Sequence, residues 1–461
     1  GEAARLSIRG SDRLASIGVA AQEPLFVIDG FIYPNDVRIG QGQQNSGSVA
    51  FNNLDPSEIE SISVLKDAAA AVYGARAANG VILVTTKRGK IGEPVISYSG
   101  SFGFTDEVSR PKMLNAYNYG RIYNIVKASD PLSTTLDRQK DLLQADELNA
   151  MRSLNYDLLD KYWETGFTQK HSVGVNGATE KVIYFANISY FDQEGNLGKL
   201  EYDRWNYRAG VDVTLKKWFK ASLQVSGDYS KKETPNVKVG GTDTEKDYRL
   251  LLTHPRYIPE SVNGLPIAAY GPTNSKVNGD QEYSFYTLQN SGDFKRDNTS
   301  NLNINTALEY DFGWSKILNG LKLRFSYAKS INNSKNNQYG SQYKIYYMSE
   351  RAGSGSHLYT PIPGQEDAFN ALLTPENFLL GNNGAPIYNG SGSSYVSRDM
   401  SRADNYQMNL TASYNRQFGE HSVGALFSIE KSEFESEYLF GTVSDPLSFG
   451  GLQSNSVGAN S

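Results

Sequence analysis

The 461-residue sequence contains no cysteine, which excludes disulfides and thiolate metal sites. It also has no run of eighteen apolar residues, so no segment could cross a bilayer as a helix and any membrane insertion has to use strands. The net charge is −5, and no basic stripe of the kind that binds a phosphate backbone is present. These absences argue against a thiolate metalloprotein, a helical membrane protein and a nucleic-acid-binding protein.

Signatures of catalysis are missing as well. The sequence has no GxSxG elbow, no GxxxxGK[ST] phosphate loop, no GxGxxG turn and no HExxH pair. Its four histidines are scattered, at His171, His254, His357 and His421. We therefore expect a protein that is not an enzyme and that needs no cofactor.

One acidic segment has a spacing that some calcium loops share. Asp243, Glu245 and Asp247 stand two residues apart. An EF-hand loop also needs a central glycine, which this segment lacks. The pattern therefore favours a solvated acidic loop over a metal site.

Two short helices are predicted near the start of the chain. Asp55, Pro56 and Glu58 fall at the N-cap, N1 and N3 positions of a helix start that resembles a capping box. Asp67 precedes a run of alanines, which predicts a second capped helix that ends near Gly74.

Strands are predicted between and after these helices. Residues 62–64 alternate as in a strand, and an Asn-Gly turn at residues 79–80 leads into the β-branched residues 81–86. The cations at residues 87–90 indicate that the chain becomes solvent-exposed where that strand ends. Together the elements predict a compact α+β unit around a small mixed sheet.

Beyond residue 90 the sequence consists of long segments with strict two-residue alternation. In residues 205–215 one face carries Trp205, Tyr207, Ala209, Val211, Val213 and Leu215, and the other carries Asn206, Arg208, Gly210, Asp212 and Thr214. The same period runs through residues 219–229, 302–312, 321–327 and 406–414, and more weakly through 95–104, 171–177, 182–190, 421–431 and 434–440. We expect roughly ten strands, each about long enough to cross a bilayer at a tilt.

The links between these strands separate a membrane barrel from a soluble sandwich, since both have one apolar and one polar face. Long links near residues 105–170, 191–201, 230–298 and 331–403 alternate with short ones near 178–180, 216–218, 313–320 and 416–420. Outer-membrane barrels have this asymmetry, with short periplasmic turns and long outer loops. In the first long link, residues 115–127 and 136–154 have helical character. Aromatic residues near strand ends fit an interfacial girdle, at Trp205, Trp218, Tyr229, Phe312 and Trp314.

Three motifs occur in order: PLFVIDG at residues 24–30, LDPSEIESISVLKDA at residues 54–68 and YGARAANGVILVTTKRG at residues 73–89. Together they resemble the second half of the plug domain of SusC-like (SusC/RagA-type) TonB-dependent outer-membrane transporters. The segment from Lys170, KHSVGVNGATEKVIYFANISYFDQEGNLG, looks like the early barrel strands of the same family.

The resemblance implies a fold and a division of the chain. The family forms a transmembrane antiparallel β-barrel of twenty-two strands with a small α+β plug inside, and this chain has room for about half of those strands. We expect the C-terminal part of the plug in residues 1–90 and the N-terminal part of the barrel, with long extracellular loops, in residues 91–461. Residues 5–11 look like a mid-plug strand, so we expect the earlier plug, any accessory domain and the TonB-contacting segment to precede Gly1, and the remaining strands to lie elsewhere.

The resemblance also implies a function. It is TonB-dependent active import of glycans or oligopeptides across the outer membrane, energised through TonB by the inner-membrane ExbB/ExbD complex. The expected partners are a SusD-like surface lipoprotein that acts as a lid and the lipid of the outer membrane, and a dimer of transporter–lipoprotein pairs is compatible with it. In the plug's outer loop, Tyr33, Asn35, Asp36 and Arg38 are the expected substrate contacts, although this loop could instead only pack against the barrel wall.

Two other classes of function stay open at this point. A plugged barrel could act as a surface receptor or adhesin without import. A soluble or envelope β-rich enzyme, such as a glycan hydrolase, would have the same strand alternation, and solubility without detergent would distinguish it from both barrel hypotheses.

Overall fold

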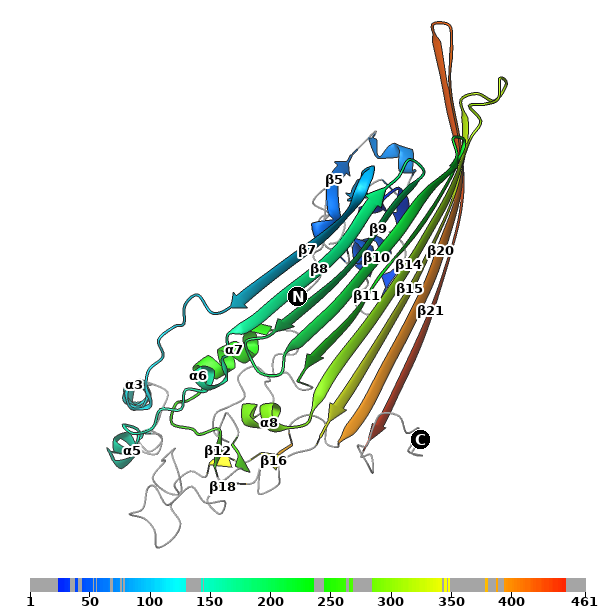
Figure 1. Ribbon diagram of the computed structural model, residues 1–461. Coiled ribbons are helices and arrows are strands. Elements are labelled where there is room, and N and C mark those ends of the chain that lie inside the picture. Colours follow the sequence, from blue (N-terminus) through cyan, green and yellow to red (C-terminus); the bar gives the residue numbers. More distant parts are fainter. Residues whose placement is uncertain are drawn as a thin grey trace.

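The computed structural model consists of a small plug-like unit beside one large antiparallel sheet (Figure 1). It describes residues 24–33, 38–39, 44–52, 54, 56–66, 69–74, 77, 79–129, 142–143, 145–235, 244–262, 265–267, 284–341, 344–345, 347–348, 378–379, 387–388 and 394–444. Residues 5–11, Asp55, Asp67, Asp243 and His357, which the sequence singled out, lie outside this part of the chain.

The small unit is built on a four-stranded mixed sheet in the order β2-β1-β6-β5. Its strands are β1 (Leu25–Ile28), β2 (Phe31–Tyr33), β5 (Ile59–Leu65) and β6 (Val81–Thr86). β1 and β6 are parallel and the other pairs are antiparallel. The predicted small mixed sheet and its strand at residues 81–86 are thus confirmed.

The helices predicted in this unit are shorter than expected. Residues Pro56–Glu58 form a single 3-10 turn (η1), because the chain enters β5 at Ile59 to pair with β6. Residues Ala71–Tyr73 form a second 3-10 turn (η3), which Gly74 ends with a φ of +78°. An α-helix, α2 (Ser46–Asn52), and the short pair β3 (Arg38–Ile39) and β4 (Gln44–Asn45) complete the described part of the unit.

The large sheet contains nine strands in simple meander order within the described residues. They are β7 (Gly92–Thr105), β8 (Gly166–Ala178), β9 (Val182–Glu194), β10 (Glu201–Lys216), β11 (Phe219–Thr234), β14 (Phe294–Asp311), β15 (Leu321–Gly340), β20 (Tyr395–Phe418) and β21 (His421–Ser444). The estimate of about ten was one too many, because residues 421–431 and 434–440 form a single strand, β21. That strand pairs with β20 along its whole length, so the two segments are not interrupted by a turn.

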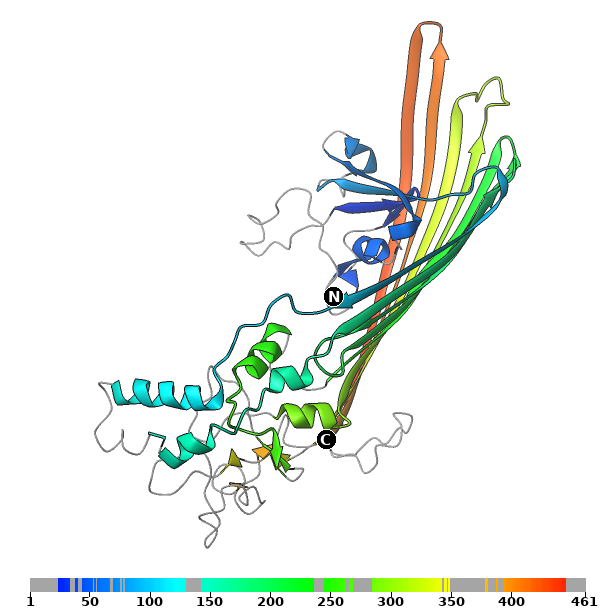
Figure 2. The same cartoon turned by 60° about the vertical axis from the view of Figure 1, so that its left-hand side comes forward.

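The two faces of the sheet differ as the alternation predicts. The face toward the small unit carries buried polar side chains, among them Asn206, Arg208 and Gln224. The opposite face exposes large apolar side chains such as Trp205 and Leu223, which are 45% and 44% exposed. Figure 2 shows the small unit against only one side of the curved sheet, so one face is internal and the other faces outward.

Short turns and long links lie at opposite ends of the sheet. The short turns cover residues 179–181, 217–218, 312–320 and 419–420 and gather at the upper end in Figure 1. The helices of the long links lie beyond the lower end, as α3 (Ala116–Ser129), α5 (Ala145–Ala150), α6 (Leu158–Tyr162), α7 (Thr244–Thr253) and α8 (Phe285–Asn290). Short strands accompany them, as β12 (Ser261–Val262), β13 (Leu265–Pro266), β16 (Lys344–Ile345), β17 (Tyr347–Met348), β18 (Phe378–Leu379) and β19 (Ile387–Tyr388). Three of the four predicted long links are long in the structure. The prediction is wrong for the link between β9 and β10, which covers only residues 195–200 and is shorter than the turn at residues 312–320.

The predicted helices of the first long link and the acidic segment can also be compared with the structure. The helical character predicted for residues 115–127 corresponds to α3, and within residues 136–154 the described helix is α5. The acidic segment is not a loop where it is described, because Glu245 and Asp247 belong to α7. No group of three or more metal-ligating side chains occurs among the described residues. Within the same residues, no helix has the length and apolarity needed to span a membrane.

Candidate functional site

The most densely connected polar cluster lies where the small unit meets the large sheet. It begins at Asp29, which follows β1 and has a φ of +50°, and Gly30 follows with a φ of +81°. Two successive positive φ values are the signature of a type I′ hairpin turn, for which Asp-Gly is a preferred sequence. The turn joins β1 to β2 and directs the Asp29 carboxylate toward the end of β6.

Asp29 is held there by the neighbouring parallel strand. Its Oδ1 accepts a hydrogen bond of 2.9 Å from the Thr86 backbone N–H, and its Oδ2 accepts one of 2.7 Å from the Thr86 hydroxyl. β1 and β6 run parallel and in register, so their carboxyl ends meet at one edge of the small sheet. This topology brings together two residues that lie 57 positions apart.

The large sheet contributes the charges that complete the cluster. From β10, Arg208 donates to Asp29 Oδ2 and, at 2.6 Å, to the Thr86 hydroxyl. From the end of β6, Arg88 donates to Asp212 of β10 and lies 3.8 Å from Asp29 Oδ1. The Arg208 guanidinium also lies 4.3 Å from the ring centroid of Phe185. We call these five residues, Asp29, Thr86, Arg88, Arg208 and Asp212, the plug anchor.

Burial makes the central pair of the plug anchor energetically important. The side chains of Asp29 and Arg208 are 1% and 7% exposed, whereas Arg88 and Asp212 are 26% and 22% exposed. A buried ion pair contributes little net stability compared with apolar packing, but removing one partner leaves a buried charge uncompensated, at a cost of about 3 kcal/mol or more. The plug anchor therefore fixes the position of the small unit without being a large source of stability.

Apolar packing and a close backbone approach support the same docking. Ala307 of β14 joins the apolar core formed by Phe26, Ile28 and Tyr33 of the small unit, among others. At Gly89 an added Cβ would lie 2.2 Å from the carbonyl oxygen of Gly177 in β8. Only glycine allows the chain to pass so close to the sheet at this point.

The four residues predicted to contact substrate have different positions. Tyr33 is 5% exposed, and its hydroxyl accepts a hydrogen bond of 3.0 Å from Asn305 Nδ2 of β14. Burial raises the pKa of Tyr33 above its usual value. Arg38 lies in β3, and Asn35 and Asp36 lie outside the described residues. In this structure Tyr33 thus belongs to the contact between the plug-like unit and the sheet.

Sequence reasoning did not single out the plug anchor. It placed the cations of residues 87–90 at an exit into water, which is wrong for Arg88 because that side chain pairs with Asp212 across the interface. A signal was available, since Arg208 and Asp212 are opposite charges on the polar face of a strand whose other face is apolar. Charges on an internal face need partners, but the sequence did not indicate which segment would supply them.

Amide side chains dominate the rest of the internal face. Asn301 donates to Asp228 at 2.9 Å, and Ser330 donates to Asn303 at 2.5 Å. Other amide atoms are buried and have no hydrogen-bond partner within the described residues, including Asn305 Oδ1 and Gln407 Oε1. This wall therefore has hydrogen-bonding capacity beyond what its own residues use.

The first and third long links fold together into one unit, here called the outer unit, at the far end of the sheet. Ala116 and Met151 from the first link share an apolar core with Tyr257 and Ile258 from the third. Arg256 joins Asp157 at 2.6 Å. The helices in Figure 2 are grouped accordingly below the strand ends.

His254 is an internal group of this outer unit. It is buried, and Nε2 lies 2.8 Å from the Ile258 carbonyl, to which a neutral ring donates its proton. Burial lowers the pKa of His254 to about 4, because a charged ring would lose its hydration. This histidine is a neutral packing residue under ordinary conditions.

The aromatic residues expected in an interfacial girdle lie at the two ends of the outward face. Trp205 and Tyr229 are 45% and 47% exposed toward the long-link end, and Trp205 packs against Tyr190 with ring centroids 4.7 Å apart. Trp218 and Trp314 lie in the short turns at the opposite end. Apolar side chains such as Leu223 lie between the two groups, as expected for a surface in contact with lipid.

Comparison with known proteins shows which proteins this chain resembles. The family model of the TonB-dependent receptor plug domain matches residues 1–81. The TonB-dependent receptor SusC of Bacteroides thetaiotaomicron is 34% identical over 197 residues, which cover 42% of this chain and 17% of that protein. The TonB-dependent receptor P26 of Formosa agariphila is 26% identical over 291 residues, 60% of this chain and 25% of that protein.

Solved structures agree on the fold. The RagAB peptide transporter matches with a TM-score of 0.61 and 19% identity, over 92% of this chain and 43% of that chain. The chain resembles the SusC-like TonB-dependent transporters. The small unit corresponds to their plug domain and the nine-stranded sheet to part of their β-barrel.

The resemblance to this family gives the location of the chain. The chain is an integral part of an outer-membrane β-barrel protein. The relatives are named as receptors and transporters, not as enzymes, so no catalytic activity is assigned. The chain spans about a sixth to a quarter of the length of the curated relatives it matches.

Proposed function

We propose that this protein imports glycans or oligopeptides actively across the outer membrane, with energy delivered through TonB. The observation that carries the proposal is the plug held against the polar internal face of the sheet through a small buried cluster, the plug anchor. A stopper fixed by a few directional contacts can be displaced and returned to the same position. A stopper fused to the wall by a continuous apolar core could not.

The proposed division of the chain follows from the same contacts. Residues 1–90 form the C-terminal part of the plug, and residues 91–461 form the N-terminal part of the barrel with its long extracellular links. The plug anchor crosses this boundary, with Asp29, Thr86 and Arg88 on the plug side and Arg208 and Asp212 on the barrel side.

In this mechanism each anchor residue has a separate task. Asp29 is oriented by two hydrogen bonds from Thr86 before it meets the barrel, so the plug presents a preorganised carboxylate. Arg208 receives that carboxylate in a water-poor site, where the interaction is strong and directional. Force on the plug would break these contacts together, and their geometry would guide the plug back.

Substrate contacts are proposed at the plug loop that contains Tyr33, Asn35, Asp36 and Arg38. The amide-rich internal wall is compatible with either substrate class, because an amide can both donate to and accept from sugar hydroxyls and peptide backbones. The RagAB relative is named as a peptide importer. For the present protein, glycans and oligopeptides are both retained.

The proposed partners follow the same family pattern. A SusD-like surface lipoprotein would cover the barrel at the long-link end, where the outer unit formed by the first and third links offers a folded surface. A dimer of such transporter–lipoprotein pairs is compatible with this arrangement. TonB would act from the short-turn side, which is periplasmic in outer-membrane barrels.

An uptake assay in matched strains with and without TonB tests the function. Cells expressing the intact protein and its lipoprotein should accumulate labelled glycan or peptide only when TonB is present. Uptake that persists unchanged without TonB would contradict energised import. Surface binding with no uptake in either strain would instead identify a receptor or adhesin.

Substrate identity requires a second experiment. The purified transporter–lipoprotein pair is incubated with a glycan mixture and with a peptide mixture, and the retained molecules are identified by mass spectrometry. Retention from one mixture alone would assign the substrate class. A variant of Arg38 then tests the plug loop, since unchanged retention would remove that loop from the binding site.

A further inference from the structure

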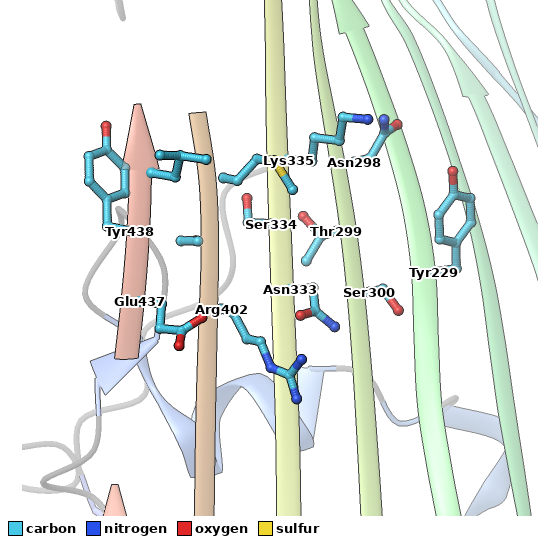
Figure 3. Close-up of a pocket in the computed structure, with 13 residues that line it drawn as sticks. Tyr229, Asn298, Thr299, Ser300, Asn333, Ser334, Lys335, Arg402, Glu437 and Tyr438 are labelled. Carbon is cyan, nitrogen blue, oxygen red and sulfur yellow. The ribbon is translucent and has the colours of Figure 1, made fainter. Parts of the chain in front are cut away.

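One cross-strand row on the internal face has chemistry that the plug anchor does not use. At one end Phe191 of β9 lies directly opposite Arg204 of β10, and at the other Ser401 of β20 lies opposite Tyr438 of β21. From Arg204 the opposed positions run from strand to strand through side chains that each carry a hydroxyl: Ser230, Thr299, Ser334 and Ser401. We call the positions from Phe191 to Tyr438 the hydroxyl row, and Thr299, Ser334 and Tyr438 are labelled in Figure 3.

The hydroxyl row lies on the outer side of the plug anchor. Arg204 precedes Arg208 by four residues on β10, whose start is at the long-link end of the sheet. At about 3.3 Å per strand residue, the separation along the strand is roughly 13 Å. Long links are extracellular in outer-membrane barrels, so a ligand on the row would lie beside the docked plug on the side from which substrate enters.

Aromatic rings lie at both ends of the row. The ring of Phe191 packs against that of Tyr202 with centroids 6.0 Å apart, and Tyr438 is 62% exposed. Neither Phe191 nor Tyr202 belongs to an apolar core cluster within the described residues. A polar barrel interior needs no such rings to hold water, whereas the apolar face of a sugar ring packs well against them.

The polar groups between the rings are available to a ligand. None of the four hydroxyls forms a side-chain hydrogen bond with another residue that the structure describes. The Nε atom of Arg204 is buried and has no hydrogen-bond partner in the same part of the chain. Hydroxyls both donate and accept, so the row matches the mixed hydrogen-bonding capacity of sugar hydroxyls.

Charges around the row are balanced. In the described strands, the row and the two adjacent rows of the same face contain three cations and three carboxylates: Lys170, Arg204, Lys232, Asp228, Asp297 and Asp399. Lys232 lies directly opposite Asp297, and Tyr438 donates to Asp399 at 3.1 Å. Because no field of one sign dominates, the site favours an uncharged ligand over an acidic or basic one.

The spacing of the row favours a glycan over a peptide. Neighbouring strands are about 4.8 Å apart, so the groups of the row repeat at that interval. The interval is close to the advance of one pyranose ring along an extended sugar chain. An extended peptide advances about 3.4 Å per residue and would not stay in step with the row.

We propose that the hydroxyl row binds an uncharged segment of a glycan on its way to the plug, an inference that rests on the import function proposed above. Sugar rings would pack on Phe191 and Tyr202 at one end and on Tyr438 at the other. The hydroxyls between them would exchange hydrogen bonds with the sugar, and Arg204 would donate to a ring hydroxyl.

Retention of sugars by the purified transporter–lipoprotein pair tests the aromatic end. Wild type, Phe191→Leu and Tyr202→Leu are incubated with a mixture of neutral oligosaccharides of glucose, mannose, galactose and xylose, and separately with a tryptic peptide mixture. Each variant should retain about tenfold less oligosaccharide, as the loss of one ring contact predicts. Tyr190→Leu removes a ring from the outward face beside Phe191 and should change nothing. Heat-modified gel mobility confirms that each variant is folded.

A second pair of variants tests the hydroxyls. Thr299→Val removes one hydroxyl from the row while keeping the shape of the side chain, and should lower oligosaccharide retention about fivefold. Thr306→Val makes the same change on the outward face of the same strand and should leave retention unchanged.

Uptake by wild type with and without TonB is measured in parallel, so that the two proposals fail separately. Uptake that does not need TonB, with oligosaccharide retention still dependent on Phe191 and Tyr202, would refute energised import and support the row. TonB-dependent uptake with equal retention by wild type and these two variants would refute the row. Retention of peptides alone, or of nothing from either mixture by wild type, would refute it as well.

Discussion

At the scale of single residues, the plug is held by side chains whose contribution to docking depends on their hydrogen-bond and ion-pair partners. The Asp29 carboxylate is placed to accept a hydrogen bond from Arg208 because the Asp-Gly turn gives Asp29 a left-handed backbone and Thr86 fixes the carboxylate. Changes at these positions should therefore affect plug docking more than they affect the barrel.

Arg208→Ala should release the plug locally. The change leaves the Asp29 carboxylate buried without its strongest partner, at a cost of about 3 kcal/mol, so amide protection in β1 and β6 should fall by about a hundredfold. Hydrogen exchange read by mass spectrometry measures this effect. Arg416→Ala, which removes an arginine near a short turn, should leave protection unchanged, and equal protection in both variants would disprove the role of the plug anchor.

Gly89→Ala should weaken the same docking by a steric route. The new Cβ would lie 2.2 Å from the Gly177 carbonyl oxygen, so the plug or β8 has to shift, at a cost of about 1–3 kcal/mol. Gly441→Ala is the matched control, because no atom lies within 4 Å of its added Cβ. Thermal unfolding of the two variants gives the comparison, and the idea fails if both midpoints equal that of wild type.

At the scale of elements, strand alternation predicted the internal and outward faces correctly. The period of two assigned Trp205 and Val211 to one side of β10 and Arg208 and Asp212 to the other, as found. The helix start near residue 55 was less predictable, because β5 takes up the residues from Ile59 onward through its pairing with β6.

Leu223→Arg should impair the barrel according to depth in the membrane. Leu223 lies on the outward face, opposite Val211 and Thr306, and an arginine there would cost about 2–4 kcal/mol. Ser300→Arg, on the same face but beyond the apolar rows, should cost about 1 kcal/mol or less. Urea unfolding in lipid vesicles measures both values. Equal costs would show that the two positions do not differ in depth.

The outer unit should lose stability in mild acid through His254. The pKa of His254 in the folded state is about 4, below the usual 6.5. The outer unit therefore has its full stability above pH 6.5 and loses stability as the pH falls toward 4. In that window the unfolded histidine binds a proton that the folded one excludes, which removes about 3 kcal/mol by pH 4. Hydrogen exchange of α7 across this range measures the loss.

His254→Gln keeps a side-chain donor for the Ile258 carbonyl but cannot titrate. The steep pH dependence of α7 protection should then disappear, whereas His421→Gln on exposed β21 should leave it unchanged. A pH dependence that survives His254→Gln would assign the effect to another group.

At the scale of the whole molecule, the plug lies against the internal face of the nine-stranded sheet. Because the plug anchor is the main polar attachment described between them, its loss should make the outer membrane permeable. Cells with Arg208→Ala should become more sensitive to a large hydrophilic antibiotic, to the same degree with and without TonB. Cells with Gly441→Ala should not. Unchanged sensitivity with Arg208→Ala would mean that other contacts keep the plug in place.

The sequence by itself determined the class of each segment in this protein. Ordered motifs identified the plug, the period of two identified the strands and their faces, and link lengths identified the two ends of the barrel. These features are local, since each depends on residues that are close in the chain.

Tertiary structure alone decided which distant groups meet. Asp29 and Arg208 are 179 positions apart, and Tyr33 and Asn305 are 272 apart, so no local pattern could pair them. Each strand pattern says that a side chain is internal or outward, but register and sheet curvature decide which neighbours it has.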